Sequence, residues 1–237
     1  MRLSFLRLAS LLATLLLASS SLLPGQSFPT SGFADHVALA DFNRDGFPDM
    51  AVVTEEPAVD VFFNDHHGVF GNFTRYSVPG TGPALAVDIN GDGWPDILIA
   101  RGNGSAKTLL LNNRDGTFRT GTAPTTQLPV FSFAAGDFNR DGKVDLAAFE
   151  GKQIEILINK GSGTFAPVQI LKMSGSSASG VVGDFDGDGF ADIANSEGNK
   201  ALVWWGKGSG TFAAPAIITP PSTDGFATLA AADFNND

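Results

Sequence analysis

The chain contains no cysteine among its 237 residues, so it can form neither a disulfide framework nor a thiolate metal site. Histidine is scarce as well, with three residues, and this leaves little basis for a zinc or copper site or for histidine chemistry. No segment after the first 25 residues has a sustained helical period of apolar residues. These absences favour a β-structure and a chemistry based on oxygen ligands.

Basic residues are also few, because 15 Lys and Arg stand against 25 Asp and Glu and give a formal charge of −10. A chain this acidic is a poor candidate for binding nucleic acid, whose phosphates need basic partners. Fifteen of the 25 acidic residues lie in five copies of one short loop. Carboxylates this close repel one another unless a cation lies among them. Four divalent ions would change the formal charge from −10 to −2.

The repeated loop has nine residues, and its first copy reads DFNRDGFPD. Oxygen-bearing side chains occupy positions 1, 3, 5 and 9, and the glycine at position 6 permits a tight bend. Position 7 varies, as expected if only its backbone carbonyl serves as a ligand. The candidate metal ligands are Asp41, Asn43, Asp45, Phe47, Asp49; Asp88, Asn90, Asp92, Trp94, Asp96; Asp137, Asn139, Asp141, Lys143, Asp145; Asp184, Asp186, Asp188, Phe190, Asp192; and, in the incomplete fifth copy, Asp233, Asn235 and Asp237.

Calcium fits these ligands best, because it takes six to eight oxygen atoms in a flexible cage. We expect one Ca²⁺ in each of the four complete loops, where it would tie two strands together. Magnesium is an alternative, although it usually keeps several waters and seldom has a dedicated protein cage. The loop is not an EF-hand, because position 12 holds no glutamate and the flanking segments are strands. Hairpin chemistry alone explains one Asp-Gly turn but not acids at positions 1, 5 and 9 in four copies.

The loops begin 47, 49, 47 and 49 residues apart, which indicates one structural unit repeated along the chain. Each unit contains a run of small apolar residues before the loop, a strand after it, a third strand, and a fourth strand after a Gly-x-Phe turn. The pattern predicts an all-β chain, a β-propeller of four-stranded antiparallel blades, with a linear β-solenoid as the alternative. The expected blades are 33–80, 81–127, 128–175 and 176–223, with the start of a fifth at 224–237.

Phenylalanine recurs at two places in this unit, and we predict that these side chains pack between blades. One set follows the first loop position, and the other closes the Gly-x-Phe turn; the residues are Phe42, Phe138, Phe185 and Phe234, and Phe70, Phe118, Phe165 and Phe212.

The first 25 residues have a different composition. Arg2 and Arg7 precede the uncharged run LASLLATLLLASSSLL, and small residues surround Ala18 to Ser20. This composition predicts a signal peptide at 1–25 followed by the repeat region at 26–237. The protein is therefore expected to be extracellular, periplasmic or on the cell surface, without stable membrane insertion after cleavage. An uncleaved anchor is the alternative, but the apolar run is short and contains serines.

Loops of the form D-x-[DN]-x-D-G-x-x-D between strands, with Gly-x-Phe turns, resemble FG-GAP/VCBS repeats, the blades of propellers like that of the integrin α-subunit. The resemblance covers Phe33 to Asp237, although the Gly-Ala-Pro tripeptide of the integrin type is not kept. It implies calcium in the hairpin loops and a ring that usually has seven blades. Since the sequence stops inside the fifth loop, we expect it to be the N-terminal part of a longer product. Residues 25–32 resemble a fourth strand that would close the ring.

Outside the loops, the sequence offers no Ser/His/Asp set, nucleophile motif or phosphate-binding glycine loop. We therefore expect a non-catalytic module for binding or adhesion, with a protein or a glycan as its partner. Two alternatives stay open at this point. The repeats are either the propeller part of an extracellular lyase or hydrolase that acts on polysaccharides, or a spacer for a domain beyond Asp237.

Overall fold

A computed structural model describes residues 30–101, 107–219, 229 and 231. These residues form strands, turns and extended segments, and none of them is helical. Accordingly, the described part of the chain has no helix with the length and hydropathy of a membrane-spanning segment. The expected signal peptide, the body of the proposed closing strand and the fifth loop lie outside the described residues.

The strands form four sheets of four strands each. Their bounds, blade by blade, are β1 Ala34–Ala40, β2 Asp49–Thr54, β3 Ala58–Asn64 and β4 Phe70–Ser77; β5 Ala84–Val87, β6 Asp96–Ile99, β7 Thr108–Asn112 and β8 Phe118–Gly121; β9 Ser132–Gly136, β10 Asp145–Phe149, β11 Gly151–Asn159 and β12 Phe165–Ser177; β13 Gly180–Gly183, β14 Asp192–Glu197, β15 Lys200–Trp204 and β16 Ala216–Ile218.

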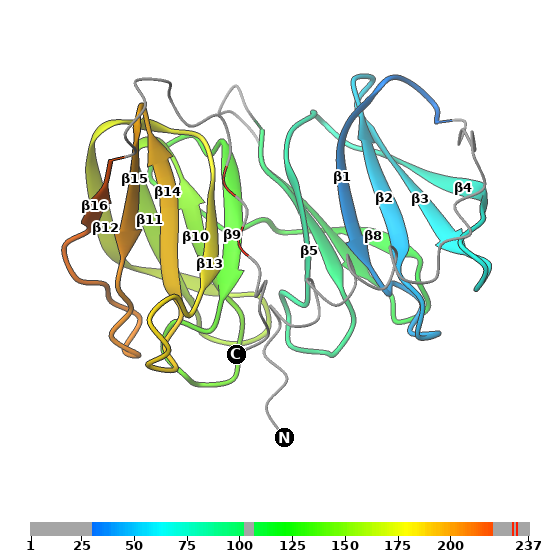
Figure 1. The fold of residues 1–237 in the computed structure, drawn as a ribbon. Coiled ribbons are helices and arrows are strands. Elements are labelled where there is room, and N and C mark those ends of the chain that lie inside the picture. Colours follow the sequence, from blue (N-terminus) through cyan, green and yellow to red (C-terminus); the bar gives the residue numbers. More distant parts are fainter. Residues whose placement is uncertain (1–29, 102–106, 220–228, 230, 232–237) are drawn as a thin grey trace.

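Each sheet is an antiparallel meander in which strands that are consecutive in sequence are neighbours in space. The first strands of successive blades contact one another, β1 with β5, β5 with β9, and β9 with β13. The sheets therefore lie side by side, with their first strands innermost and next to one another. The acidic loops lie at the lower ends of the blades in Figure 1. This is the arrangement of a β-propeller, so the predicted fold class is confirmed.

The hydrophobic core consists of layers between consecutive blades. Between blades 1 and 2, Val53 and Val61 pack with Ile97 and Leu110 in one cluster of buried residues. Corresponding clusters lie between blades 2 and 3 and between blades 3 and 4. Because side chains alternate across a strand, each inner sheet contributes to two layers at once. This explains why β6 and β10 consist entirely of buried residues.

The prediction that phenylalanines pack between blades is confirmed for Phe42, Phe118, Phe138, Phe165 and Phe212. Phe70 is half-buried and belongs to none of the described clusters between blades, and Phe234 lies outside the described residues. Phe42 packs edge-to-face on Phe118 of the next blade, with ring centroids 5.4 Å apart, and Phe138 packs on Phe212 in the same way at 5.2 Å. The prediction is wrong for Phe185, which is 38% exposed. Its equivalents Phe42 and Phe138 are covered by a phenylalanine of the following blade, whereas the described part of the chain contains no blade after blade 4.

Candidate metal centre

The four complete acidic loops join the first strand of each blade to the second. In all four blades, position 1 of the loop directly follows the first strand, and position 9 is the first residue of the second strand. The antiparallel pairing of these two strands therefore holds both ends of each loop together.

Position 1 shapes the loop around its own carboxylate. In the first loop, Asp41 Oδ1 accepts a hydrogen bond from the backbone N–H of Asp45 at 3.0 Å, and Asp41 Oδ2 accepts one from Gly46 at 2.9 Å. The glycine has a φ of 92°, a left-handed conformation that favours glycine over other residues. Asp88, Asp137 and Asp184 accept the bond from the equivalent glycine in their own loops.

Positions 3 and 5 each accept a hydrogen bond from the backbone N–H two residues ahead. In the first loop these bonds run from Asp45 N to Asn43 Oδ1 at 3.0 Å and from Phe47 N to Asp45 Oδ1 at 2.9 Å. The other three loops repeat both bonds at 2.8–3.2 Å. These successive turns orient the side-chain oxygens in the same way in all four loops. The turns depend only on residues within the loop, because Asp and Asn side chains bond to the backbone two residues ahead.

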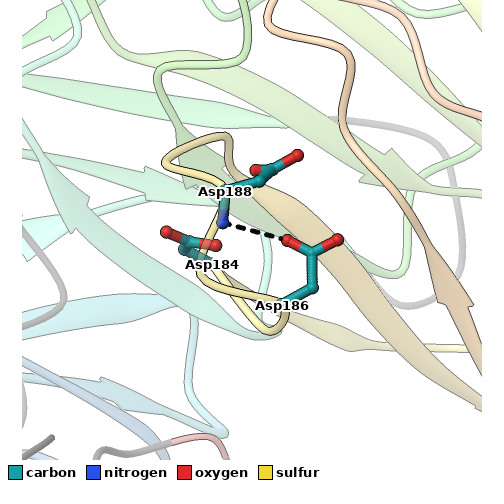
Figure 2. Close-up of side chains that lie close together, drawn as sticks. All are labelled: Asp184, Asp186 and Asp188. Atoms are coloured by element: carbon teal, nitrogen blue, oxygen red, sulfur yellow. Dashed lines mark hydrogen bonds between the residues drawn. The ribbon is translucent and has the colours of Figure 1, made fainter.

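The fourth loop brings three carboxylates together. Asp184, Asp186 and Asp188 each offer one oxygen atom, and these atoms all lie within 4.8 Å of one another. All three side chains are exposed and belong to the single loop between β13 and β14 (Figure 2). The backbone N–H of Asp188 donates to Asp186 Oδ1 at 3.2 Å, the dashed line of Figure 2.

Basic side chains distinguish the first three loops from the fourth. The position-5 carboxylate is paired in each of these three: Asp45 with His66 at 3.0 Å, Asp92 with Arg114 at 3.1 Å, and Asp141 with Lys143 at 2.8 Å. Within the described residues, no basic group pairs with Asp188. The turn between the third and fourth strands supplies His66 and Arg114, and the same place holds glycine in blades 3 and 4.

These contacts lower the pKa of the position-5 carboxyls. Partial burial by itself would raise the pKa of Asp45 and Asp92, but hydrogen bonds from the loop backbone and from the basic partners outweigh it. For Asp141, the bond from the Lys143 ammonium is the main cause of the lower pKa. In the first three loops, the lower pKa favours the ionised form of the position-5 carboxylate.

Position 9 has the opposite environment. Asp49, Asp96, Asp145 and Asp192 are fully buried. In Asp145, Oδ2 accepts the N–H of Phe138 at 2.9 Å and Oδ1 accepts the N–H of Asn159 at 2.8 Å. The other three aspartates make the equivalent pair of bonds, so each one links its loop to the end of the third strand.

Burial raises the pKa of the position-9 carboxyls. For Asp49, Asp96 and Asp145 the pKa rises to about 6, and for Asp192 it also rises, because desolvation outweighs the two backbone hydrogen bonds. These aspartates therefore support the strands in addition to their predicted ligand role, which stays a prediction. Their oxygens do not belong to the close group formed by positions 1, 3 and 5 of the fourth loop.

The structure also assigns a role to position 7 that the sequence did not predict. The guanidinium of Arg44, at position 4 of the first loop, lies 5.4 Å from the ring centroid of Trp94, at position 7 of the second loop. Arg140 of the third loop lies 4.9 Å from the ring of Phe190 of the fourth loop in the same way. In the second and fourth loops, position 7 therefore contacts position 4 of the preceding loop, and the varied residues at both positions were the available sequence signal.

A second contact between blades comes from an asparagine at the end of the third strand. Asn112 Nδ2 donates to the backbone carbonyl of Phe42 at 2.8 Å, and Asn159 Nδ2 donates to that of Ile89 at 3.0 Å. Both acceptors are position-2 residues of the preceding blade's loop. The recurrence of asparagine at this place in three of the four units is the sequence signal for this contact.

The donor atoms suit a hard cation, because they are carboxylate and amide oxygens without nitrogen or sulfur ligands among the predicted sets. The fourth loop fits such an ion best, since its three carboxylates converge and have no basic partner in the described residues. The first three loops offer fewer free carboxylate oxygens. Asp233, Asn235 and Asp237 of the fifth loop lie outside the described residues.

Comparison with known proteins agrees with this repeat structure. A family model described as an FG-GAP-like repeat matches residues 41–98, 88–148, 137–195 and 184–237. Each match begins at the first position of one of the acidic loops. A search of curated proteins finds no match.

Several solved structures share the fold. One is a lectin of Agrocybe aegerita that recognises non-reducing terminal N-acetylglucosamine, with a TM-score of 0.60, 23% identity, and coverage of 76% of this chain and 51% of the lectin chain. Another is the V. cholerae biofilm matrix protein Bap1, with a TM-score of 0.51, 19% identity, and coverage of 82% of this chain and 30% of that one.

A third is BBS1N in complex with ARL6DN, with a TM-score of 0.57, 14% identity, and coverage of 81% of this chain and 59% of that one. The chain thus spans about half the length of the lectin and less than two thirds of the other two proteins. At these identities the comparison establishes the fold and nothing beyond it.

Proposed function

Because the chain belongs to the family of FG-GAP-like repeat proteins, we propose that it is a secreted, calcium-binding β-propeller that acts as a non-catalytic binding or adhesion module. Its partner is a glycan or a protein. Secretion rests on the composition of residues 1–25, with two arginines before an uncharged apolar run.

The observation that carries the calcium proposal is the group of Asp184, Asp186 and Asp188. Three carboxylate oxygens within 4.8 Å of one another repel strongly unless a cation lies among them. A bound Ca²⁺ would supply positive charge at this point and would hold positions 1, 3 and 5 of the loop together. The loop is already held in shape without the ion, because the carboxylates at positions 1, 3 and 5 accept hydrogen bonds from the loop backbone.

A binding role is supported by the proteins that share the fold. The Agrocybe aegerita lectin recognises a terminal sugar, Bap1 is a biofilm matrix protein, and BBS1N was solved in complex with ARL6DN. In addition, the carboxylates gathered in the described loops serve the loop structure, which leaves them poorly placed as a catalytic acid and base.

The calcium proposal predicts that the purified protein melts at a higher temperature in calcium than in chelator. With a dissociation constant of about 0.1–1 mM, typical of extracellular calcium modules, ~10 mM Ca²⁺ would raise the melting temperature by about 5 °C or more. Thermal unfolding followed by circular dichroism measures this shift. Asp188→Asn should reduce this shift, because the variant removes one converging charge from the loop whose carboxylates have no basic partner among the described residues.

Glu55→Gln is the matched control, since it removes one exposed carboxylate from the turn between β2 and β3, outside the loops. This variant should keep the full calcium shift. Equal melting temperatures in calcium and in chelator would overturn the calcium proposal. A shift that Asp188→Asn and Glu55→Gln reduce equally would show general charge screening in place of a site.

A further inference from the structure

A cavity of about 350 Å³ lies between blades 1 and 2, at the ends of the strands opposite the acidic loops. Its lining residues come from the start of β1, the turn between β2 and β3, the linker between β4 and β5, and the end of β6; they are Asp35, His36, Pro57, Gly80, Thr81, Gly82, Pro83 and Arg101. The volume falls within the range of small-molecule sites, and the cavity plays no part in the loop chemistry described above.

Backbone hydrogen bonds fix the walls of this cavity. The N–H of Val78 donates to the carbonyl of Pro57 at 3.1 Å and ties the end of β4 to the turn between β2 and β3. The N–H of Ala100 donates to the carbonyl of Pro83 at 2.9 Å and ties the end of β6 to the linker. The two walls are thus preorganised, which reduces the entropy cost of binding a ligand.

Arg101 is the main charged group of the cavity. Its side chain lies against the backbone of Gly80, where a Cβ atom would overlap Nε and would lie 2.7 Å from both Cδ and Cζ. No hydrogen bond or ion pair joins the Arg101 side chain to any described residue. The guanidinium therefore lies partly buried in a cavity with its donors available.

Two acidic side chains near the cavity have a basic neighbour, and in both cases this neighbour is a residue other than Arg101. Asp35 lies 3.7 Å from His36, and Glu56 pairs with Arg75 at 3.5 Å. Glu55, in the same turn as Pro57, does not line the cavity. The cavity thus combines the Arg101 guanidinium, which has no partner among the described residues, with the Asp35 carboxylate, the His36 ring, the Thr81 hydroxyl and two proline rings.

We propose that this cavity binds an acidic saccharide, with the carboxylate of a uronic acid residue on the Arg101 guanidinium. A guanidinium binds a carboxylate through two parallel hydrogen bonds, and it is the group best matched to that ligand. The Asp35 carboxylate would accept hydrogen bonds from sugar hydroxyls, and the Thr81 hydroxyl would donate or accept one. Pro57 and Pro83 would contact the apolar C–H face of the sugar ring. The inference rests on the proposed binding role and names the class of ligand.

The test measures the binding of a trigalacturonate to the full, calcium-loaded chain by isothermal titration calorimetry. The matched neutral trisaccharide of galactose, sodium acetate and inorganic phosphate serve as comparison ligands. We expect the trigalacturonate to bind, the neutral sugar to bind at least about tenfold more weakly, and acetate and phosphate to show no comparable binding, because the charged bonds to Arg101 carry much of the affinity.

Two variants address the cavity by different means. Arg101→Gln removes the charge, and Gly80→Ala keeps the charge but displaces the guanidinium, because the new Cβ would overlap it. Each should weaken trigalacturonate binding by about tenfold or more. Arg119→Gln, which removes an exposed arginine on β8, should leave the affinity unchanged within about twofold. Melting curves of all variants establish that they are folded.

The outcomes separate this inference from the proposed function. Trigalacturonate binding that survives both cavity variants would overturn the site but not the binding role. Equal binding of phosphate or acetate would overturn the saccharide assignment and leave a general anion site. Binding of neutral glycans alone would overturn the acidic class. A protein that binds none of the ligands yet gains stability from calcium would overturn this inference while the calcium proposal stands.

Discussion

At the scale of single residues, the aspartates of one loop have two different tasks. At position 5 of the first three loops, loop hydrogen bonds and a basic side chain lower the pKa of Asp45, Asp92 and Asp141. Position 9 is fully buried, and its pKa is raised by desolvation. The same residue type, four positions apart, therefore holds charge at the surface in one case and organises buried backbone in the other.

Asp145→Asn tests the structural task of position 9. The asparagine has one acceptor oxygen and one NH₂ group, so it cannot accept both the Phe138 and the Asn159 N–H bonds. One buried N–H would lose its partner, and we expect a loss of about 1–3 kcal/mol in the free energy of unfolding. Urea denaturation in chelator measures this loss without a contribution from calcium.

Asp115→Asn is the control for that measurement. Asp115 is exposed in the turn between β7 and β8, and its Oδ1 accepts the Thr117 N–H at 2.9 Å, a bond that asparagine can retain. This variant should change the free energy of unfolding by no more than about 0.5 kcal/mol. If Asp145→Asn changed the free energy of unfolding as little as Asp115→Asn does, the buried hydrogen bonds of position 9 would not stabilise the blade.

At the scale of elements, neighbouring loops are connected side chain to side chain. Arg44 reaches Trp94, and Arg140 reaches Phe190, each from one blade to the next. Between the second and third loops the pair is absent, because position 4 is Gly91 and Lys143 turns to its own loop. The lower face of the described blades is thus joined in pairs by cation–π contacts.

A double-mutant cycle tests the contact between the first two loops. We expect Arg44→Gln and Trp94→Leu to show a coupling of about 0.5–1 kcal/mol, the range of cation–π pairs at the surface. Unfolding of the wild type, both single variants and the double variant in urea gives this value.

Arg44→Gln combined with Phe190→Leu is the matched cycle. These residues belong to different pairs, so their effects should add within about 0.5 kcal/mol. Additivity in both cycles would mean that the arginine contributes no more than its general charge.

At the scale of the whole molecule, the buried position-9 carboxyls make stability depend on pH. The pKa of Asp49, Asp96 and Asp145 is about 6 in the folded chain, against 3.8 for an unperturbed aspartate. Between these values the folded state binds more protons than the unfolded state, so the free energy of unfolding falls as the pH rises. Their contribution is complete below about pH 4 and lost as the pH passes 6.

We therefore expect the melting temperature in chelator to increase as the pH is lowered from 7 to 5. Below about pH 4 the carboxyls with a lowered pKa, such as Asp45 and Asp141, act in the opposite direction, because they lose stabilising contacts on protonation. Asp145→Asn should reduce the slope between pH 5 and 7, and Asp115→Asn should not. A melting temperature that falls steadily from pH 7 to 5 in chelator would contradict this assignment.

The sequence by itself determined the blades. The spacing of the acidic loops and the apolar runs between them predicted the strands of each unit within a few residues, as β2 and β10 illustrate. It also predicted that Phe42 and Phe138 are buried. These features depend on local chemistry, namely the alternation of side chains along a strand and the turn preference of Asp and Gly, which repeat with the unit.

Only the tertiary structure decided how the blades meet. Phe42 accepts a bond from Asn112, 70 residues away, and Arg44 lies over a ring of the next blade. Asp45 has a basic partner and Asp188 has none among the described residues, and this contrast depends on the turn between the third and fourth strands of each blade. Arg101 likewise enters a cavity whose walls come from four separate segments. Such contacts follow from the twist and spacing of packed sheets, which no local pattern specifies.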